Sequence, residues 1–342
     1  MIKTPLTLIP YLLILIIGLG LGVFLMKNKT TSSFFNKTLV EESPKFDDTR
    51  KLEWSNDFKL VDIRSSVDEN LQKAYFYTSK SDQPKALIVS LHSWSGYYDQ
   101  KDGLADLSKE KDLNYIHPDF RGANWTKDAC CSELALNDID DAISYAIKNS
   151  NVDTTKIYVI GSSGGGYATL STFMKSKHKI KKFSAWVPIS DLVAWYAESK
   201  IKGNKYAQNI LDCTDSKNGL NIEEARSRSP IFWNTPVEKL KNTELSIYTG
   251  IYDGIQGSVP ITHAINFYNK VLNEQSVSEN ANKVSDSEKL NLLEFRKPLG
   301  EFGTIADRKV FLKKESGNVS LTIFEGNHEM LTEFAFNKLI ED

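Results

Sequence analysis

The stretch KIYVIGSSGGGYAT, at residues 156–169, constrains the fold of this chain more than any other. The apolar run IYVI is typical of a buried strand, GSSGGG of a sharp turn, and the residues that follow have a helical pattern. The spacing Gly161-x-Ser163-x-Gly165 fits a nucleophile elbow, in which a serine occupies a strained turn between a strand and a helix. Glycines on either side keep this turn free of crowding side chains. We therefore predict that Ser163 is a nucleophile.

Glycine-rich turns between a strand and a helix also occur in phosphate-binding sites, and a turn of this kind can serve close packing alone. The P-loop needs Lys and then Ser or Thr after its last glycine, whereas Tyr167 and Ala168 follow Gly166 here. The dinucleotide-binding fingerprint needs a third glycine at the place of Thr169. The flanking strand and helix therefore favour the nucleophile elbow over the other two interpretations.

The composition is that of a folded protein with a sizeable core. The chain has 342 residues, a formal net charge of −2 and 41% hydrophobic residues. This length accommodates one α/β domain of about 250–300 residues with extensions. The near-neutral charge, without a basic stripe of interleaved aromatic residues, gives no support for nucleic-acid binding. We expect no nucleic-acid partner.

The sequence contains three cysteines, Cys130, Cys131 and Cys213. In a domain outside the cytoplasm, Cys213 could pair with one of the adjacent two. Buried, unpaired thiols are an equally good interpretation. No histidine lies at ligand spacing from any of them, so we expect no metal site.

The first 26 residues differ from the rest of the chain. They are almost wholly apolar from residue 5 onward, over a length that can span a bilayer. The segment is longer than a usual signal-peptide core and lacks a clear cleavage site, which favours a transmembrane anchor over a cleaved signal peptide. Residues 27–50 are polar and predict a linker. We expect a membrane-anchored or exported protein whose domain at residues 51–342 lies outside the cytoplasm, while lysines on both sides of the segment leave its orientation open.

Strand-like and helical patterns alternate along residues 51–342. This alternation predicts an α/β fold in which helices flank a mostly parallel sheet of eight strands. Residues 192–241 are rich in aromatic residues and short helical patterns, and they predict a small helical cap over the strand ends. The expected strands are residues 58–63, 71–78, 86–91, 113–117, 157–160, 183–189, 245–249 and 319–324. The expected helices are residues 137–150, 167–174, 261–272 and 330–340.

A serine hydroxyl is a weak nucleophile that needs a base, and the base needs an orienting acid. After an elbow serine the acid and then the histidine follow along the chain. His328 comes directly after the last expected strand and is the predicted base. Asp191 and Asp253 both close strands, but Asp191 can cap the helix that follows it. We favour Asp253 because its glycine-bounded loop can reach across to His328.

From residue 86 to its end, the chain resembles the prolyl-oligopeptidase-type α/β-hydrolases of serine peptidase family S9 and their esterase relatives. This resemblance implies the α/β-hydrolase fold and an acid after the strand that follows the cap, which supports Asp253. Three departures are present: about 60 residues before the core leave no room for a β-propeller, His92-Ser93-Trp94 replaces the usual HGG, and residues 273–320 form an insertion. The matching stretches are LHSWSG, PDFRG, ACCSELALNDIDDAISY, GSSGGG, RSP, YDGIQGSVPITHAINFYN and FEGNHE.

In this fold, backbone N–H groups stabilise the oxyanion that forms during attack. One comes from the residue after the nucleophile, here Gly164, and the other from the loop after the first core strand. By analogy we assign the second to Trp94. We expect His92 to brace this loop rather than to take part in chemistry.

We expect a serine hydrolase that cleaves an acyl-sugar or another small ester through an acyl-enzyme, without a metal or organic cofactor. The alternative is an exopeptidase or aminopeptidase of the S9 type that cleaves short peptides. A peptidase would be expected to carry an acidic pair in the cap, and Glu223-Glu224 is a weak candidate. A binding protein without catalytic activity on the same fold is a third possibility, but it would lack a member of the triad. The partners expected are therefore a small ester or a short peptide and, through residues 1–26, a membrane.

Overall fold

The computed structural model describes residues 52–275 and 280–341. The predicted anchor and linker at residues 1–50 lie outside this part of the chain. Among the helices of the described part, none combines the length and the apolar character that crossing a bilayer requires.

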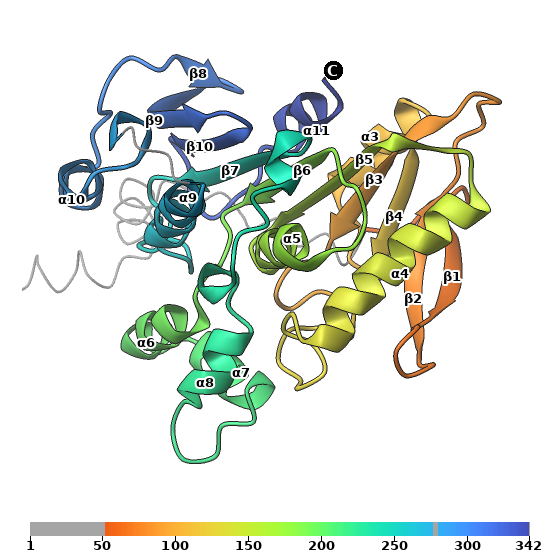
Figure 1. The fold of residues 1–342 in the computed structure, drawn as a ribbon, viewed down its shortest axis with the longest axis horizontal. Helices are drawn as coiled ribbons and strands as arrows, with labels where there is room; N and C mark the ends of the chain where they lie inside the picture. The colour runs from red at the N-terminus through yellow and green to blue at the C-terminus, as the bar shows by residue number, and fades with distance from the viewer. Residues whose placement is uncertain (1–51, 276–279, 342) are drawn as a thin grey trace, which may run out of the picture. The chain divides into compact units, whose positions relative to one another are not determined.

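A ten-stranded sheet forms the centre of the domain, with the strand order β1-β2-β4-β3-β5-β6-β7-β10-β9-β8 (Figure 1). The six strands from β4 to β10 in this order pair in parallel, and the strands at both ends pair antiparallel. The mostly parallel α/β-hydrolase sheet is thus confirmed. The strands are β1 (Lys59–Arg64), β2 (Leu71–Tyr77), β3 (Lys85–Leu91), β4 (Asn114–Pro118), β5 (Val152–Ser162), β6 (Lys182–Trp186), β7 (Glu244–Gly250), β8 (Thr304–Ile305), β9 (Arg308–Ser316) and β10 (Val319–Phe324).

The expected number of eight strands was too low. β8 and β9 lie in the insertion to which the sequence assigned no role, and β9 pairs with β10 so that it extends the sheet. The same insertion contains α10 (Asp286–Glu294), whose first turn is closed by a capping box between Ser285 and Glu288. The polar composition of this segment obscured the short elements, because edge strands and surface helices bury few residues.

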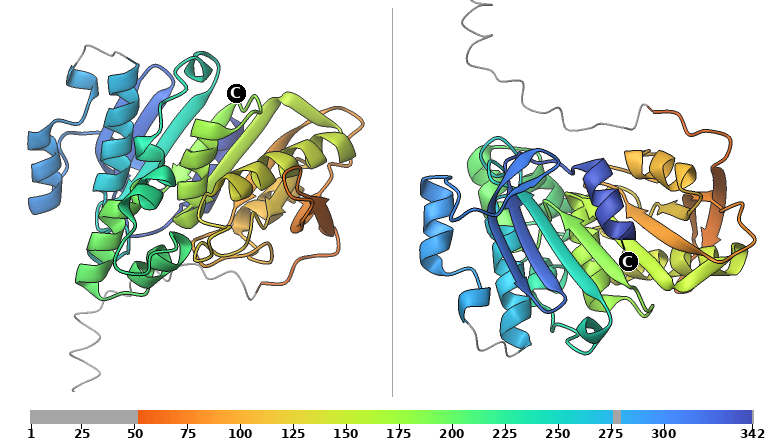
Figure 2. Two further views of the ribbon diagram at one scale, coloured as in Figure 1. Left: turned by 60° about the horizontal axis from the view of Figure 1, so that its bottom comes forward. Right: turned by 90° about the horizontal axis from the view of Figure 1, so that it is seen from above.

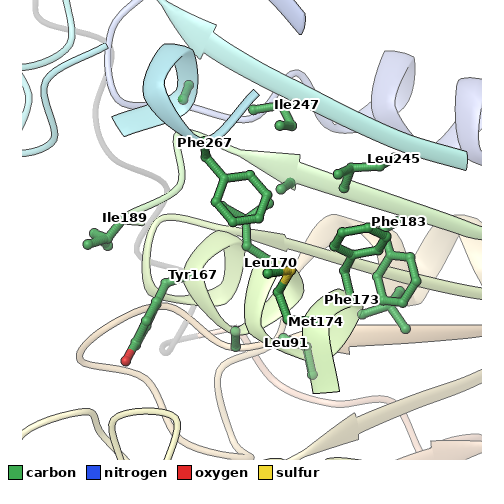
Figure 3. Close-up of a cluster of buried hydrophobic side chains, with 14 of the residues drawn as sticks. Leu91, Tyr167, Leu170, Phe173, Met174, Phe183, Ile189, Leu245, Ile247 and Phe267 are labelled. Atoms are coloured by element: carbon green, nitrogen blue, oxygen red, sulfur yellow. The ribbon is translucent and has the colours of Figure 1, made fainter. Parts of the chain in front are cut away.

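Helices cover both faces of the sheet, as the two further views show (Figure 2). Successive strand residues point to opposite faces, so Leu87 and Val89 join one buried cluster while Ile88 joins the other. Figure 3 shows part of the first cluster, where Leu170 and Phe173 pack among apolar side chains from neighbouring strands. The first face carries α4 (Glu133–Asn149), α5 (Gly164–Lys175) and α9 (Thr262–Glu274); the second carries α3 (Gly103–Glu110) and α11 (Thr332–Ile340).

The segment predicted as a cap contains three short α-helices between β6 and β7 (Figure 1). Two single 3₁₀ turns lead from them back to the sheet. Trp195 is fully buried against the core, so the cap is packed onto the domain through its aromatic residues. The elements are α6 (Leu192–Lys202), α7 (Tyr206–Cys213), α8 (Ile222–Ser227), η2 (Pro230–Phe232) and η3 (Lys239–Lys241).

One helix begins earlier than expected and another was not expected at all, each for a local reason. α4 begins at Glu133 rather than at residue 137, because the Ser132 side chain accepts a hydrogen bond from the Ala135 N–H and caps the helix there. α3 was not predicted, and its N-cap Asp102 accepts in the same way from the Ala105 N–H. Both starts lie directly after irregular loops, where apolar periodicity gives no warning.

Candidate active site

The end of β5 delivers Ser163 to the first turn of α5. Ser163 is the N-cap of this helix and has φ 59° and ψ −116°, a conformation that L-residues rarely adopt. Its N–H donates to the Trp186 carbonyl at 2.9 Å, and its carbonyl accepts from the Tyr167 N–H at 2.8 Å. The neighbouring strand and the helix thus hold the strained turn predicted from the sequence.

The glycines of the elbow allow close backbone contacts. A Cβ on Gly161 would lie 2.5 Å from the carbonyl of Gly165, which is the other glycine of the predicted spacing. A Cβ on Gly164 would lie 2.2 Å from the backbone nitrogen of Trp94. Because real Cβ atoms do not approach so closely, neither position can hold a larger residue without backbone movement.

Ser163, His328 and Asp253 are brought together by three loops that follow strands. The Nε2 atom of His328 lies 2.7 Å from the Ser163 hydroxyl, and its Nδ1 atom lies 2.7 Å from Oδ2 of Asp253. All three residues are buried, with exposed fractions of 3% to 8%. β5, β7 and β10 run parallel, so their carboxyl ends meet at one edge of the sheet.

The direction of the hydrogen bonds follows from the carboxylate of Asp253, which can only accept. Its Oδ1 atom accepts from the N–H groups of Gly254 at 2.8 Å and Val259 at 3.0 Å. Its Oδ2 atom therefore accepts from Nδ1–H of His328, which fixes the tautomer of the ring. The Nε2 atom then carries a lone pair and accepts from the Ser163 hydroxyl, as a general base must.

The two candidate oxyanion donors lie side by side. The Gly164 N–H belongs to the first turn of α5, where an N–H has no acceptor within its own helix. The Trp94 nitrogen is adjacent, as the close contact at Gly164 shows. The Trp94 carbonyl accepts from the Asn124 N–H at 2.9 Å, which holds this loop against the next one. Two amides beside the nucleophile and near a helix N-terminus can stabilise a developing negative charge.

His92 braces the loop that carries Trp94, as the sequence predicted. Its Nδ1 and Nε2 atoms lie 2.9 Å from the Ser93 carbonyl and 2.6 Å from the Asp119 carbonyl. The ring also stacks on Phe120, with 3.8 Å between the ring centroids. Burial lowers the pKa of His92.

Asp191, the competing acid, has a different task. Its Oδ1 atom accepts from the Val193 and Ala194 N–H groups at 2.8 and 3.1 Å, so it caps α6. One member of the acidic pair in the cap, Glu224, is also engaged elsewhere, because it accepts from Arg228 Nε at 2.7 Å. The structure therefore places Asp253, and not Asp191, against His328.

A second group of serine, histidine and aspartate lies beneath the loop of His92. Ser90 donates to Oδ2 of Asp102, and Tyr115 donates to Oδ1 at 3.0 Å. The Nδ1 atom of His117 lies 3.8 Å from Oδ2 of Asp102. Burial lowers the pKa of His117 to about 3 and raises that of Asp102. Sequence reasoning did not identify this group, because its members are spread over two strands and a helix cap without a motif.

Aromatic side chains from the cap lie next to the triad. Trp94 and Trp195 meet edge to face at 4.6 Å between ring centroids, and Tyr206 stacks on Trp195 at 4.9 Å. Ser258, five residues after Asp253 in the chain, places its hydroxyl 3.4 Å from Nε2 of His328. Neither Tyr206 nor Ser258 was predicted, since Ser258 reaches His328, and Tyr206 stacks on Trp195, only through the folding of a loop and the cap.

Two other features lie apart from the triad. A cavity of about 730 Å³ opens between α4, α5 and α8, and its lining includes Lys175, Arg228 and Trp233 but no triad residue. The three cysteines are free and buried, and burial raises the pKa of Cys131 and Cys213. In the described residues, no cluster of three or more His, Cys, Asp or Glu side chains is arranged to hold a metal ion.

Comparison with known proteins gives a family match and several fold matches. A sequence model of the prolyl oligopeptidase family matches residues 105–282. No match was found among curated proteins. The structure of Pyrococcus horikoshii acylaminoacyl peptidase is 18% identical, with a TM-score of 0.50 over 64% of this chain and 36% of its own.

Two further structures cover more of the chain. A Mycobacterium tuberculosis puromycin-hydrolyzing peptidase is 11% identical, with a TM-score of 0.55 over 82% of this chain and 37% of its own. Oligopeptidase B from Leishmania major is 12% identical, with a TM-score of 0.55 over 83% of this chain and 36% of its own. The chain thus spans 36% to 37% of the length of these three structures.

Proposed function

Because the chain belongs to the prolyl oligopeptidase family and is a serine hydrolase, we propose that it is a serine peptidase that cleaves short peptides or aminoacyl amides. The observation that carries this proposal is the hydrogen-bonded chain from Ser163 through His328 to Asp253, with 2.7 Å at each step. The fold matches, which are named as peptidases, support an amide substrate over the small ester first expected from the sequence.

In the proposed mechanism the Ser163 oxygen attacks the carbonyl carbon of the scissile bond. Its proton passes to Nε2 of His328, and Asp253 remains a carboxylate that stabilises the charged ring. The N–H groups of Gly164 and Trp94 donate to the oxyanion. His328 then gives the proton to the leaving nitrogen, and the bond between carbon and nitrogen breaks. Water, deprotonated by His328, releases the acyl group and restores Ser163.

Amide turnover is the measurement that separates the peptidase from the esterase, because a serine triad cleaves activated esters in either case. We expect the purified full chain to release aminomethylcoumarin from aminoacyl or N-acetyl-aminoacyl substrates. Ser163→Ala should lower kcat by roughly 10⁴-fold or more. Turnover of p-nitrophenyl butyrate without any amide turnover would replace the peptidase by an esterase. Equal amide turnover by wild type and Ser163→Ala would overturn the assignment of the nucleophile.

A further inference from the structure

A second hydroxyl lies beside the base of the triad. The Ser258 Oγ atom is 3.4 Å from Nε2 of His328, and Ser163 Oγ is 2.7 Å from the same nitrogen. A hydroxyl has one proton and two lone pairs, so it can donate to a neutral imidazole and accept from a charged one. In the neutral ring the lone pair of Nε2 accepts from the Ser163 hydroxyl, so Ser258 is placed to accept from His328 once Nε2 carries the proton.

The cap holds Ser258 through α6 and places Tyr206 of α7 beside it. Nε1–H of Trp195 on α6 donates to the Ser258 carbonyl at 2.9 Å. Tyr206 stacks on Trp195, with 4.9 Å between the ring centroids. Burial raises the pKa of Tyr206, while the neighbouring Ser258 hydroxyl offsets part of this rise, so Tyr206 stays a neutral phenol at pH 7. Ser258 thus has a neutral hydroxyl neighbour in the cap.

The loop that carries Ser258 is packed directly on the triad. A Cβ on Gly257 would lie 2.2 Å from Oδ1 of Asp253 and 2.6 Å from Cβ of His328. Lys202 of α6 donates to the Gly257 carbonyl at 3.0 Å and also to the Gly254 carbonyl. Because the loop touches both the acid and the base, and because α6 holds its carbonyls, the cap determines where Ser258 lies.

We propose that Ser258, held by Trp195 of the cap and adjacent to Tyr206, is a positioning residue that keeps the His328 ring aligned during turnover. After attack, the proton taken from Ser163 resides on Nε2 of His328. Ser258 accepts a hydrogen bond from this N–H until the proton passes to the leaving nitrogen, and it neither gains nor loses a proton itself. The role rests on the triad proposed above, and it links the geometry of the base to the position of the cap.

The test compares Ser258→Ala, Tyr206→Phe and their double variant in the full chain. As a matched control, Tyr196→Phe removes a hydroxyl from α6, where the ring contacts Lys200. One hydrogen bond to a charged group corresponds to roughly a tenfold effect on rate. We expect Ser258→Ala to lower kcat about tenfold with KM within twofold, and to slow the inactivation of Ser163 by a fluorophosphonate equally. The control should match wild type.

The double variant shows whether the two residues act together. If Tyr206 acts through Ser258, the double variant loses no more kcat than Ser258→Ala alone. Additive losses, a change in KM alone, or an unchanged inactivation rate in Ser258→Ala would each overturn the proposal. Should Ser258→Ala fail to fold, as melting curves will show, an unchanged kcat in Tyr206→Phe overturns it. Failure of wild type to react with the fluorophosphonate at Ser163 would instead contradict the triad itself.

Discussion

The molecule contains two groups made of the same three residue types. One is Ser163, His328 and Asp253; the other consists of Ser90, His117 and Asp102, which we call the Ser90 group. In the first, histidine lies between serine and aspartate, with 2.7 Å on either side. In the Ser90 group, the serine donates directly to the aspartate and the histidine stands 3.8 Å away. The order of contacts therefore differs although the composition does not.

The two groups also occupy different places in the fold. The triad residues lie on loops beyond the ends of β5, β7 and β10, next to the first turn of α5. Ser90 and His117 lie within β3 and β4, and Asp102 is committed to capping α3. Strand ends leave a side chain free to meet a substrate, whereas the body of a covered sheet does not. The order of the contacts and the position of the group in the fold, more than the residue types, therefore decide which group can act on a substrate.

The largest expected difference concerns the two aspartates. Asp253→Asn keeps the size of the side chain but no longer stabilises the charged ring of His328, so kcat should fall by roughly 10⁴-fold. Asp102→Asn should leave kcat within a few-fold of wild type, because Asn also caps a helix. Steady-state kinetics on one amide substrate, with melting curves as a control for folding, checks both.

These two variants can break the comparison directly. A loss of activity in Asp102→Asn as large as that in Asp253→Asn would mean that the Ser90 group takes part in catalysis. If neither variant lost activity, the assignment of Asp253 as the acid of the triad would be wrong.

The next effect is on the proposed oxyanion donors beside Ser163, the N–H groups of Gly164 and Trp94. Gly164→Ala would place a Cβ 2.2 Å from the Trp94 nitrogen and so force the two amides apart. We expect kcat to fall by roughly 10²- to 10³-fold, with little change in KM, since the lost interaction exists mainly in the transition state. A variant with wild-type kcat and an unchanged melting temperature would show that these amides do not hold the oxyanion.

The smallest effect is on the free energy of unfolding, and it concerns His117, the histidine of the Ser90 group. Burial lowers the pKa of His117 to about 3, below the value of about 6.5 for an exposed histidine. Between these pH values the unfolded chain binds a proton that the folded chain does not. The free energy of unfolding therefore loses nothing to His117 above pH 6.5, and it falls as the pH falls toward 3. Burial also raises the pKa of Asp102. Because Asp102 is present in both wild type and His117→Phe, the difference between their free energies of unfolding reports the titration of His117.

His117→Phe cannot bind this proton. We expect its free energy of unfolding, relative to wild type, to improve by roughly 3 kcal/mol between pH 6.5 and pH 4, while kcat at pH 7 stays unchanged. Urea titrations at several pH values measure the difference. A constant difference over this range would show that His117 is not held neutral by the fold.

The sequence was sufficient for features that depend on local spacing. Gly161, Ser163 and Gly165 lie within one turn, and their spacing alone predicts the strand, the strained residue and the helix that the structure contains. Asp253 and His328 were found because each follows a strand, and parallel strands bring their ends together. Chain order and topology thus sufficed to place the three side chains near one another.

The features that the sequence did not reveal depend on contacts between distant segments. Tyr206 and Ser258 meet only because the loop after Asp253 folds back under the cap, and no spacing encodes that path. β8 and β9 were overlooked because strands at the edge of a sheet bury too few residues to show a pattern. The residue types of the Ser90 group would suggest a catalytic triad, but the group lies in the body of the sheet, where a substrate does not reach it.

The most direct test is to label the full chain with a fluorophosphonate and to locate the label by peptide mass spectrometry. A fluorophosphonate reacts with a serine only where a base and oxyanion donors activate it. The label should be found on the peptide that contains Ser163 and not on the peptide that contains Ser90, and His328→Ala should slow labelling by roughly 10³-fold or more. A label on any other serine, or an equal rate in His328→Ala, would contradict the account.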